Sequence, residues 1–158
     1  QIARLAGAYV YAVTSTPEKE RRAIELGADE TINYRTVDFS KELWLRTGKR
    51  GVDVVLENVG PATWAGSVRS LAKGGRLVTF GATTGRFAET DLNLLFWNQI
   101  SLIGSTMAND AEFRAVMDLV FRRRLRPVVD RVMPLREGAA AQRLLEAGEQ
   151  FGKIVLEP

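Results

Sequence analysis

Residues 51–60 read GVDVVLENVG, a short apolar strand that runs into a turn ending in glycine. Val52 and residues 54–56 form a nearly continuous apolar run, which is typical of a parallel strand buried on both faces. A second run of this kind, RLVTFGATTG at 76–85, follows after one helix and also enters a glycine-rich turn. The two runs favour a fold in which buried strands alternate with single helices.

The same alternation continues in both directions from this stretch. Besides the two runs above, the patterns predict strands at 9–14, 31–33, 100–104, 128–135 and 153–157. They predict helices at 1–6, 17–26, 39–47, 62–72, 92–98, 110–121 and 137–147. Strands joined by single helices form crossover units, so the predicted fold class is α/β, with a parallel sheet covered by helices on both faces.

The start of the second helix leaves two capping patterns open. Thr16 is a natural N-cap before Pro17 in the first helical position. Ser15 and Glu18 would instead form a capping box one residue earlier. The sequence favours neither pattern.

Composition excludes several classes of site. The 158 residues are 46% hydrophobic, enough for one globular domain or one domain with an appended segment. The chain has no cysteine and no histidine, which excludes disulfides, thiolate metal sites and a histidine base within these residues. A net charge of +3 is too small to indicate a nucleic-acid partner. No membrane-spanning run or secretion signal is visible, and we expect a cytoplasmic protein.

Ligands of parallel α/β sheets bind beyond the carboxyl ends of the strands. The loops at those ends are predicted at 14–16, 58–60, 80–85 and 104–107. Three of the four contain glycine, which permits a close approach of the backbone to a ligand, although glycine is also common at such turns. Together the loops favour a nucleotide site only modestly.

Five stretches carry a resemblance to a known family: ELGADETINY (25–34), GVDVVLENVG (51–60), GGRLVTFGATTG (74–85), SLIGSTM (101–107) and FGKIVL (151–156). In this order and spacing, they resemble the C-terminal part of a medium-chain dehydrogenase/reductase. The similarity is to the branch of zinc-type alcohol dehydrogenases and quinone oxidoreductases, and it covers essentially the whole chain.

The resemblance implies an incomplete Rossmann-like, doubly wound parallel sheet. In the order 3-2-1-4-5-6 the central strand and its glycine-rich phosphate loop would precede Gln1 and are not among these residues. Residues 1–124 would be a partial dinucleotide-binding domain, and 125–158 a segment returning to a catalytic domain outside the chain. The missing strand would separate 9–14 from 52–57 and expose an edge on each. We therefore expect residues 1–158 alone to fold poorly and to bind dinucleotides weakly.

The end of the second family strand, here TST at 14–16, usually decides the cofactor. NAD-specific relatives place an acidic residue there, whereas this chain has none. The side chains within reach of a 2′-phosphate are Lys19, Arg22, Tyr34 and Arg35. The resemblance to quinone oxidoreductases gives this role to Ser15, Lys19 and Tyr34, so NADP(H) is expected rather than NAD(H). The alternative is that Ser15 and Thr16 only cap the helix and Lys19 is solvated.

The resemblance also implies the other cofactor contacts. It assigns Asn58, Val59 and Gly60 to the adenosine side, Phe80, Gly81 and Ala82 to the nicotinamide side, the backbone of Ser105 and Met107 to the carboxamide, and Lys153 to the pyrophosphate. A solvated role is the alternative for Lys153. The arginine-rich run at 122–126 follows a helix C-terminus, where cations are favoured, and is interpreted as a solvated end.

The expected function is NADPH-dependent hydride transfer to or from a small carbonyl, alcohol, or quinone or enone substrate. No catalytic residue is expected within the chain, and zinc, if used, would be bound by the absent catalytic domain. A homodimer is expected through the edge strand Ile100–Ser105, with no nucleic-acid or membrane partner. The alternatives are a non-catalytic NADPH-binding relative or another nucleotide-fold enzyme, such as an S-adenosylmethionine-dependent methyltransferase.

Overall fold

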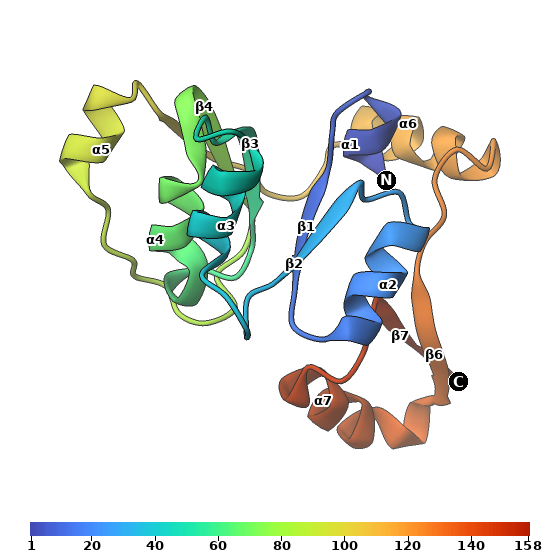
Figure 1. The fold of residues 1–158 in the computed structure, drawn as a ribbon. Helices are drawn as coiled ribbons and strands as arrows, with labels where there is room; N and C mark the ends of the chain where they lie inside the picture. The colour runs from blue at the N-terminus through green and yellow to red at the C-terminus, as the bar shows by residue number, and fades with distance from the viewer. The chain divides into compact units, whose positions relative to one another are not determined.

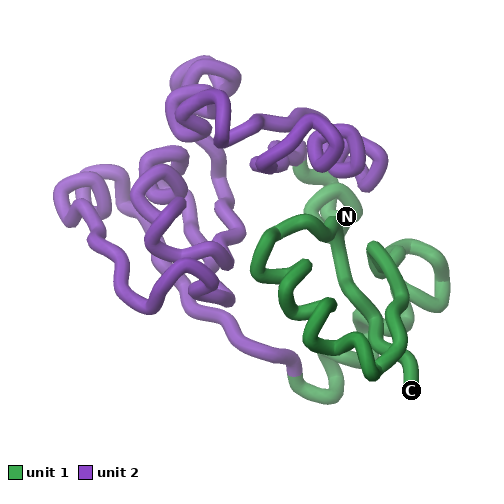
Figure 2. Tube along the Cα trace, turned by 90° about the horizontal axis from the view of Figure 1, so that it is seen from below, with its two compact units in different colours: residues 1–8, 109–158 green, residues 9–108 purple.

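The computed structural model describes residues 1–158, an α/β chain in which every strand pair is parallel (Figure 1). The chain divides into two compact units, which Figure 2 colours separately. One unit consists of residues 9–108, and the other combines residues 1–8 with 109–158. The division predicted at residues 124 and 125 concerns the arrangement of a complete enzyme and stays a prediction.

The unit of residues 9–108 contains most of the predicted alternation. Its elements are β1 (Tyr11–Thr14), α2 (Pro17–Glu25), β2 (Glu30–Asn33), α3 (Phe39–Arg46), β3 (Val52–Glu57), α4 (Pro61–Arg69), β4 (Leu71–Thr79), α5 (Leu92–Trp97) and β5 (Ser101–Gly104). They form two sheets, β1 with β2 and β3-β4-β5. The predicted α/β fold class, an incomplete Rossmann-like sheet, is therefore confirmed.

The two sheets are separated at the place where the family order puts its central strand. No backbone hydrogen bonds pair β1 with β3, which agrees with the expectation that a further strand would lie between them. On β3 the side chains of Val54 and Leu56 are exposed, Leu56 by 64%. Such apolar exposure is unusual for a parallel strand, which normally has neighbours on both sides.

Helix α3 contacts elements on both sides of this separation. The Arg46 guanidinium donates hydrogen bonds to the Thr31 carbonyl (3.1 Å) and the Glu30 carboxylate (3.0 Å) on β2. At the other end of α3, the Phe39 ring packs against Gly66 of α4, where a Cβ atom would lie 2.5 Å from Phe39 Cζ. The helix thus links the two sheets of this unit.

The cap of α2, left open by the sequence, is Thr16. Its hydroxyl accepts a hydrogen bond from the Lys19 backbone N–H (3.2 Å), and Pro17 occupies the first helical position. Thr16 with Pro17 fixes the start of the helix directly after β1.

The end of α4 departs from the sequence prediction. The pattern predicts a helix that continues to residue 72, but α4 ends at Arg69 and β4 begins at Leu71. The cause is a close backbone approach: the Val52 N–H donates to the Ser70 carbonyl at 2.9 Å. At Gly51 (φ +86°) a Cβ atom would lie 2.7 Å from the same carbonyl oxygen, so only glycine permits this contact.

The core of the three-stranded sheet is formed by Val68, Leu71, Leu77 and Ile100. Leu77 lies at the centre of β4 and is 0% exposed. The central strand of the sheet is therefore fixed by apolar packing against α4 and the segment that leads into β5.

Replacing Leu77 with alanine is expected to lower the free energy of unfolding of the complete protein by about 2–5 kcal/mol, because the buried cavity cannot collapse fully. Chemical denaturation measures this change. The matched control is Leu45→Ala on α3, where the side chain is 60% exposed and the expected change stays within about 0.5 kcal/mol. Equal losses for the two variants would contradict the assignment of the core.

The second unit contains α1 (Ile2–Leu5), α6 (Asp110–Phe121), β6 (Val129–Pro134), the 3-10 turn η1 (Leu135–Glu137), α7 (Gly138–Ala147) and β7 (Lys153–Glu157). The side chain of Gln1 exchanges two hydrogen bonds with the backbone of Arg126, each 2.9 Å long. Asn109 caps α6 in a capping box with Glu112. β6 and β7 pair in parallel through the α7 crossover, which confirms the predicted elements at this end of the chain.

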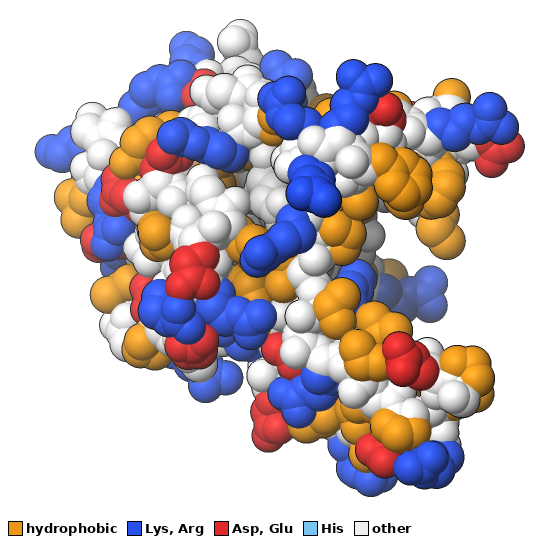
Figure 3. Space-filling model, turned by 90° about the vertical axis from the view of Figure 1, so that its right-hand side faces the viewer, with side chains coloured by type: hydrophobic (Ala, Val, Ile, Leu, Met, Phe, Trp, Pro, Cys, Tyr) orange, Lys and Arg blue, Asp and Glu red, His pale blue; other side chains and the backbone are white.

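Charged side chains are interspersed on the face shown in Figure 3, without one large patch of a single sign. Within the arginine-rich run at 122–126, the Arg122 side chain pairs with Asp118 one helical turn earlier, at 2.9 Å. No helix of the structure is both long enough and apolar enough to cross a membrane.

Candidate cofactor-binding site

The carboxyl ends of β1 and β2 bring the predicted 2′-phosphate residues to one edge. β1 and β2 are in register so that Thr14 pairs with Asn33, and the Tyr34 N–H donates to the Thr14 carbonyl at 3.0 Å. Tyr34 therefore lies directly beside the loop that contains Ser15, and its side chain is exposed. Lys19 follows in the first turn of α2.

Thr14 carries a notable polar atom at this edge. Its hydroxyl oxygen is buried and has no hydrogen-bond partner in the protein. A buried hydroxyl without a partner is costly, and one at the carboxyl end of a parallel strand is placed where a ligand can supply the missing hydrogen bond.

The loops that follow β3 and β4 are joined into one structure. The Thr84 N–H and hydroxyl both donate to the Val59 carbonyl at 2.8 Å, and the Thr83 hydroxyl donates to the Asn58 carbonyl at 3.0 Å. The Thr84 hydroxyl also accepts from the Ala62 N–H. The predicted adenosine-side and nicotinamide-side loops thus form a single surface.

Glycine is needed where these two loops meet. A Cβ atom at Gly81 would lie 2.9 Å from the Asn58 carbonyl oxygen. Gly60 has φ +90°, and a Cβ atom there would lie 3.1 Å from the Gly85 carbonyl oxygen. The two glycines therefore allow the backbones to approach more closely than side chains would permit.

The last residue of β3, Glu57, holds the first of these loops through buried hydrogen bonds. It is 3% exposed, and its carboxylate accepts hydrogen bonds from the N–H groups of Val59 (2.7 Å) and Gly60 (3.1 Å). The hydroxyls of Thr63 (3.0 Å) and Ser67 (2.5 Å) also donate to it. Burial alone would raise the pKa of Glu57, but these hydrogen bonds outweigh it, so the pKa is lowered and the carboxylate is ionised at neutral pH.

Glu57 and the four hydroxyl residues of this network, Thr63, Ser67, Thr83 and Thr84, were not among the residues predicted from the sequence. One signal was available: a carboxylate that ends an apolar strand, three residues before a Gly-Pro helix start, can accept hydrogen bonds from the N–H groups of the turn between them. Thr83 and Thr84 have their roles through hydrogen bonds to residues 25 positions earlier in the chain, and such distant contacts leave no pattern in the local sequence.

The loop after β5 continues the same edge. The Ser105 N–H donates to the Thr79 carbonyl at 2.9 Å, so Ser105 lies beside the end of β4, where Phe80 follows. Met107 adopts a left-handed backbone conformation (φ +51°) and is 95% exposed. Their backbone contacts with a carboxamide stay a prediction.

Comparison with known proteins now identifies the family. Residues 1–122 match the family model described as zinc-binding dehydrogenase. This chain belongs to that family, within the medium-chain dehydrogenases/reductases. The predicted resemblance is thereby confirmed.

The similar proteins include dehydrogenases and reductases about twice as long as this chain, and also much longer polyketide synthases, such as one of Mycobacterium tuberculosis that is 29% identical over 99% of this chain and 8% of the synthase. A 2-haloacrylate reductase of a Burkholderia species is 35% identical over 168 residues, which cover 99% of this chain and 50% of the reductase. The solved structure of an NAD-dependent alcohol dehydrogenase superposes with a TM-score of 0.93 and is 39% identical in sequence. The match covers 99% of this chain and 46% of the dehydrogenase chain. The crotonyl-CoA carboxylase/reductase AntE, solved in complex with NADP, has a TM-score of 0.90 and is 25% identical in sequence. That match covers 98% of this chain and 44% of the AntE chain.

Zinc does not fit the residues of this zinc-binding dehydrogenase chain. It has no histidine or cysteine, and no three acidic side chains lie close enough together to hold a metal ion. We therefore assign no chemical step to a metal within residues 1–158. A dinucleotide does fit, because the unpartnered Thr14 hydroxyl and the glycine-lined junction of the two loops both lie at the carboxyl edge.

Lys153 is the first residue of β7 and is exposed in the second compact unit, where its N–H donates to the Val128 carbonyl (2.8 Å). Its predicted place near the pyrophosphate stays a prediction.

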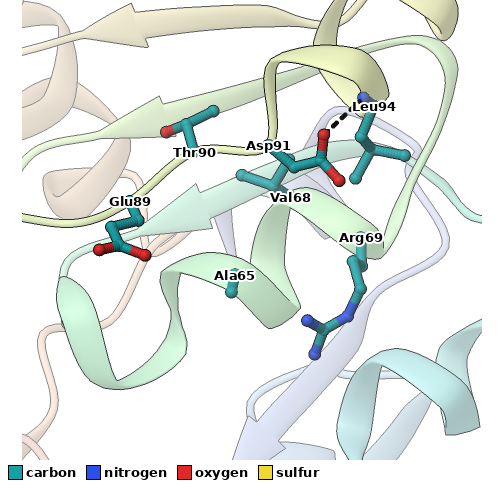
Figure 4. A pocket seen from close by; sticks show the side chains of 7 residues that line it. All are labelled: Ala65, Val68, Arg69, Glu89, Thr90, Asp91 and Leu94. Atoms are coloured by element: carbon teal, nitrogen blue, oxygen red, sulfur yellow. Dashed lines mark hydrogen bonds between the residues drawn. The ribbon is translucent and has the colours of Figure 1, made fainter.

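A separate cavity of about 210 Å³ lies between α4 and the segment before α5 (Figure 4). Among its lining side chains, Asp91 caps α5 by accepting the Leu94 N–H at 3.1 Å, drawn as a dashed line. Thr90 accepts a hydrogen bond from the Trp64 indole at 2.9 Å. These polar groups are committed to the packing of α4 and α5, and none belongs to the loops at the carboxyl edge.

Proposed function

We propose that the complete protein is an NADPH-dependent oxidoreductase that transfers hydride to or from a small carbonyl, alcohol, or quinone or enone substrate. This chain would supply the surface for the adenosine and nicotinamide portions of the cofactor. The nicotinamide carries the hydride when the cofactor is bound, and the residues of this chain bind and orient it. Family membership favours an oxidoreductase over the methyltransferase alternative.

The observation that carries the cofactor choice is the end of β1. The edge offers hydroxyls at Thr14, Ser15 and Thr16, it has Tyr34 hydrogen-bonded to Thr14 through the backbone, and the loop has no carboxylate. A 2′-phosphate carries most of a double negative charge at neutral pH and is repelled by a carboxylate. Similar structures do not decide the question, since one is an NAD-dependent alcohol dehydrogenase and another was solved in complex with NADP.

Lys19→Ala tests the proposed 2′-phosphate site in the complete protein. Charge-assisted hydrogen bonds contribute about 1.5–3 kcal/mol each, so NADPH binding should weaken by about tenfold to a hundredfold while NADH binding hardly changes. The measurement is the pair of dissociation constants at one ionic strength, since screening reduces the effect.

Lys73→Ala is the matched control, because it removes the same charge near the amino end of β4, away from the carboxyl edge. It should leave both dissociation constants unchanged. Equal weakening of NADPH and NADH by Lys19→Ala, or a preference of the unmutated protein for NADH, would contradict the proposal. Tight NADPH binding without turnover of any carbonyl, alcohol or quinone would support the non-catalytic alternative instead.

A further inference from the structure

Glu57 is the one ionisable side chain among the buried residues of this chain. Burying a carboxylate is unfavourable unless hydrogen bonds replace its hydration. Here two backbone N–H groups and two hydroxyls do so, and the charge lies at the N-terminus of α4, where the helix dipole favours it. The carboxylate is thus held ionised in one orientation.

The orientation of Glu57 determines the path of the backbone above it. Because the N–H groups of Val59 and Gly60 turn inward to the carboxylate, this segment is fixed from one side. The carbonyls of Asn58 and Val59 meanwhile accept hydrogen bonds from the loop at 80–85. Glu57 itself also accepts the Phe80 N–H at its own carbonyl, at 3.0 Å.

We propose that Glu57 is a positioning residue for the dinucleotide: its buried carboxylate sets the backbone of residues 58–60 and, through Thr83 and Thr84, that of residues 80–85. The inference rests on the proposed function, because it concerns the same cofactor surface. It adds a specific consequence. Since Glu57 acts on loops facing parts that NADPH and NADH share, its removal weakens both cofactors alike, in contrast to the removal of Lys19.

The start of α4, next to Glu57, is not a free anion site. The N-terminus of a helix commonly binds phosphate through its free N–H groups. At α4, Pro61 has no N–H, the Ala62 N–H donates to the Thr84 hydroxyl (3.2 Å) and the Thr63 N–H donates to the Gly60 carbonyl (3.0 Å), so this helix start is not available to the phosphates of the cofactor.

The test uses the complete protein with Glu57→Gln, which keeps the size of the side chain and removes its charge. We expect the dissociation constants of NADPH and NADH to rise together by about tenfold to a hundredfold, because the loss of hydrogen bonds to a charged group has effects of that size. The ratio of the two constants should stay within about twofold of the unmutated value. Asp53→Asn, at an exposed carboxylate on the same strand, is the matched control and should change neither constant.

Leu77→Ala is the control for an effect of lower stability on cofactor binding, because it removes core packing of the same sheet without changing Glu57. All variants are measured at a temperature at which each is folded. If Glu57→Gln binds both cofactors as tightly as the unmutated protein, or no more weakly than Leu77→Ala, the inference is overturned. If Glu57→Gln does not fold, Ser67→Ala decides: it removes one donor and keeps the charge, and it should weaken both cofactors by about threefold, with no change overturning the inference.

Failure of the proposed function gives a different result. In that case the unmutated protein binds neither NADPH nor NADH, or it prefers NADH. A protein that binds a dinucleotide but is indifferent to Glu57→Gln refutes only the positioning role.

Discussion

Under the proposed preference for NADPH, replacing Thr14 with aspartate is expected to shift the preference of the complete protein to NADH. Thr14 ends β1 and pairs with Asn33 at the end of β2, so a carboxylate at this position lies at the same edge as Ser15 and Tyr34. The carboxylate repels a 2′-phosphate and accepts hydrogen bonds from free ribose hydroxyls. Because both effects act in the same direction, the ratio of the two dissociation constants should change by about a hundredfold or more.

Thr14→Val separates charge from shape in this experiment. It is close to threonine in size and adds no charge, so both dissociation constants should rise by at most about tenfold, the cost of one neutral hydrogen bond, with their ratio unchanged. All constants are measured at one ionic strength, with thermal unfolding to confirm that each variant is folded. Equal weakening of NADPH and NADH by Thr14→Asp would show that the edge of β1 does not discriminate between them.

The second large effect concerns assembly, for which we propose a homodimer that pairs through β5. This strand is hydrogen-bonded only to β4, and all four of its residues are exposed. The preceding helix α5 adds exposed apolar side chains, including Trp97 at 72% exposure. An unpaired apolar edge of this kind favours pairing with a second copy of the chain.

Leu102→Pro is expected to convert the dimer into monomers. Since the Ser105 N–H points toward β4, the alternation of a strand directs the Leu102 N–H toward the free edge. Proline at this position removes a donor from the edge and leaves the pairing with β4 intact. Molar mass in solution, measured by light scattering or sedimentation, gives the result.

Ile103→Pro is the contrasting variant, because its N–H faces β4 by the same alternation. It should destabilise the chain itself and lower the midpoint of thermal unfolding. A dimer that persists unchanged in Leu102→Pro would place the interface elsewhere.

The sequence predicted most helices and strands correctly because the residues that start and end them lie within or next to each element. Glycines, caps and apolar runs mark α2, α3 and α6 within a residue or two of their observed bounds. The exceptions follow from distant contacts. β1 begins at Tyr11 instead of residue 9, because Val10 is engaged by the side chain and N–H of Asp29.

The site was predicted less completely than the fold. Loop positions follow from the parallel order of the strands, and the roles of residues such as Ser15, Asn58 and Phe80 came from the family resemblance. The family resemblance did not point to Glu57, and the local pattern does not decide its role, because an acidic residue at the end of a strand is equally compatible with solvent exposure. Its role follows from the structure, in which the hydroxyls of Thr63 and Ser67 on α4 donate hydrogen bonds to its carboxylate.

The absence of a ladder between β1 and β3 also bears on folding cooperativity. With no shared backbone hydrogen bonds, the β1–β2 sheet and the β3-β4-β5 sheet are coupled mainly through the side-chain contacts of α3. Units joined in this way open separately, and amide hydrogen exchange would then report two protection levels within residues 9–108. A strand that pairs with both β1 and β3 would merge them into one cooperative unit, so the same strand that completes the sheet would also set the rigidity of its cofactor edge.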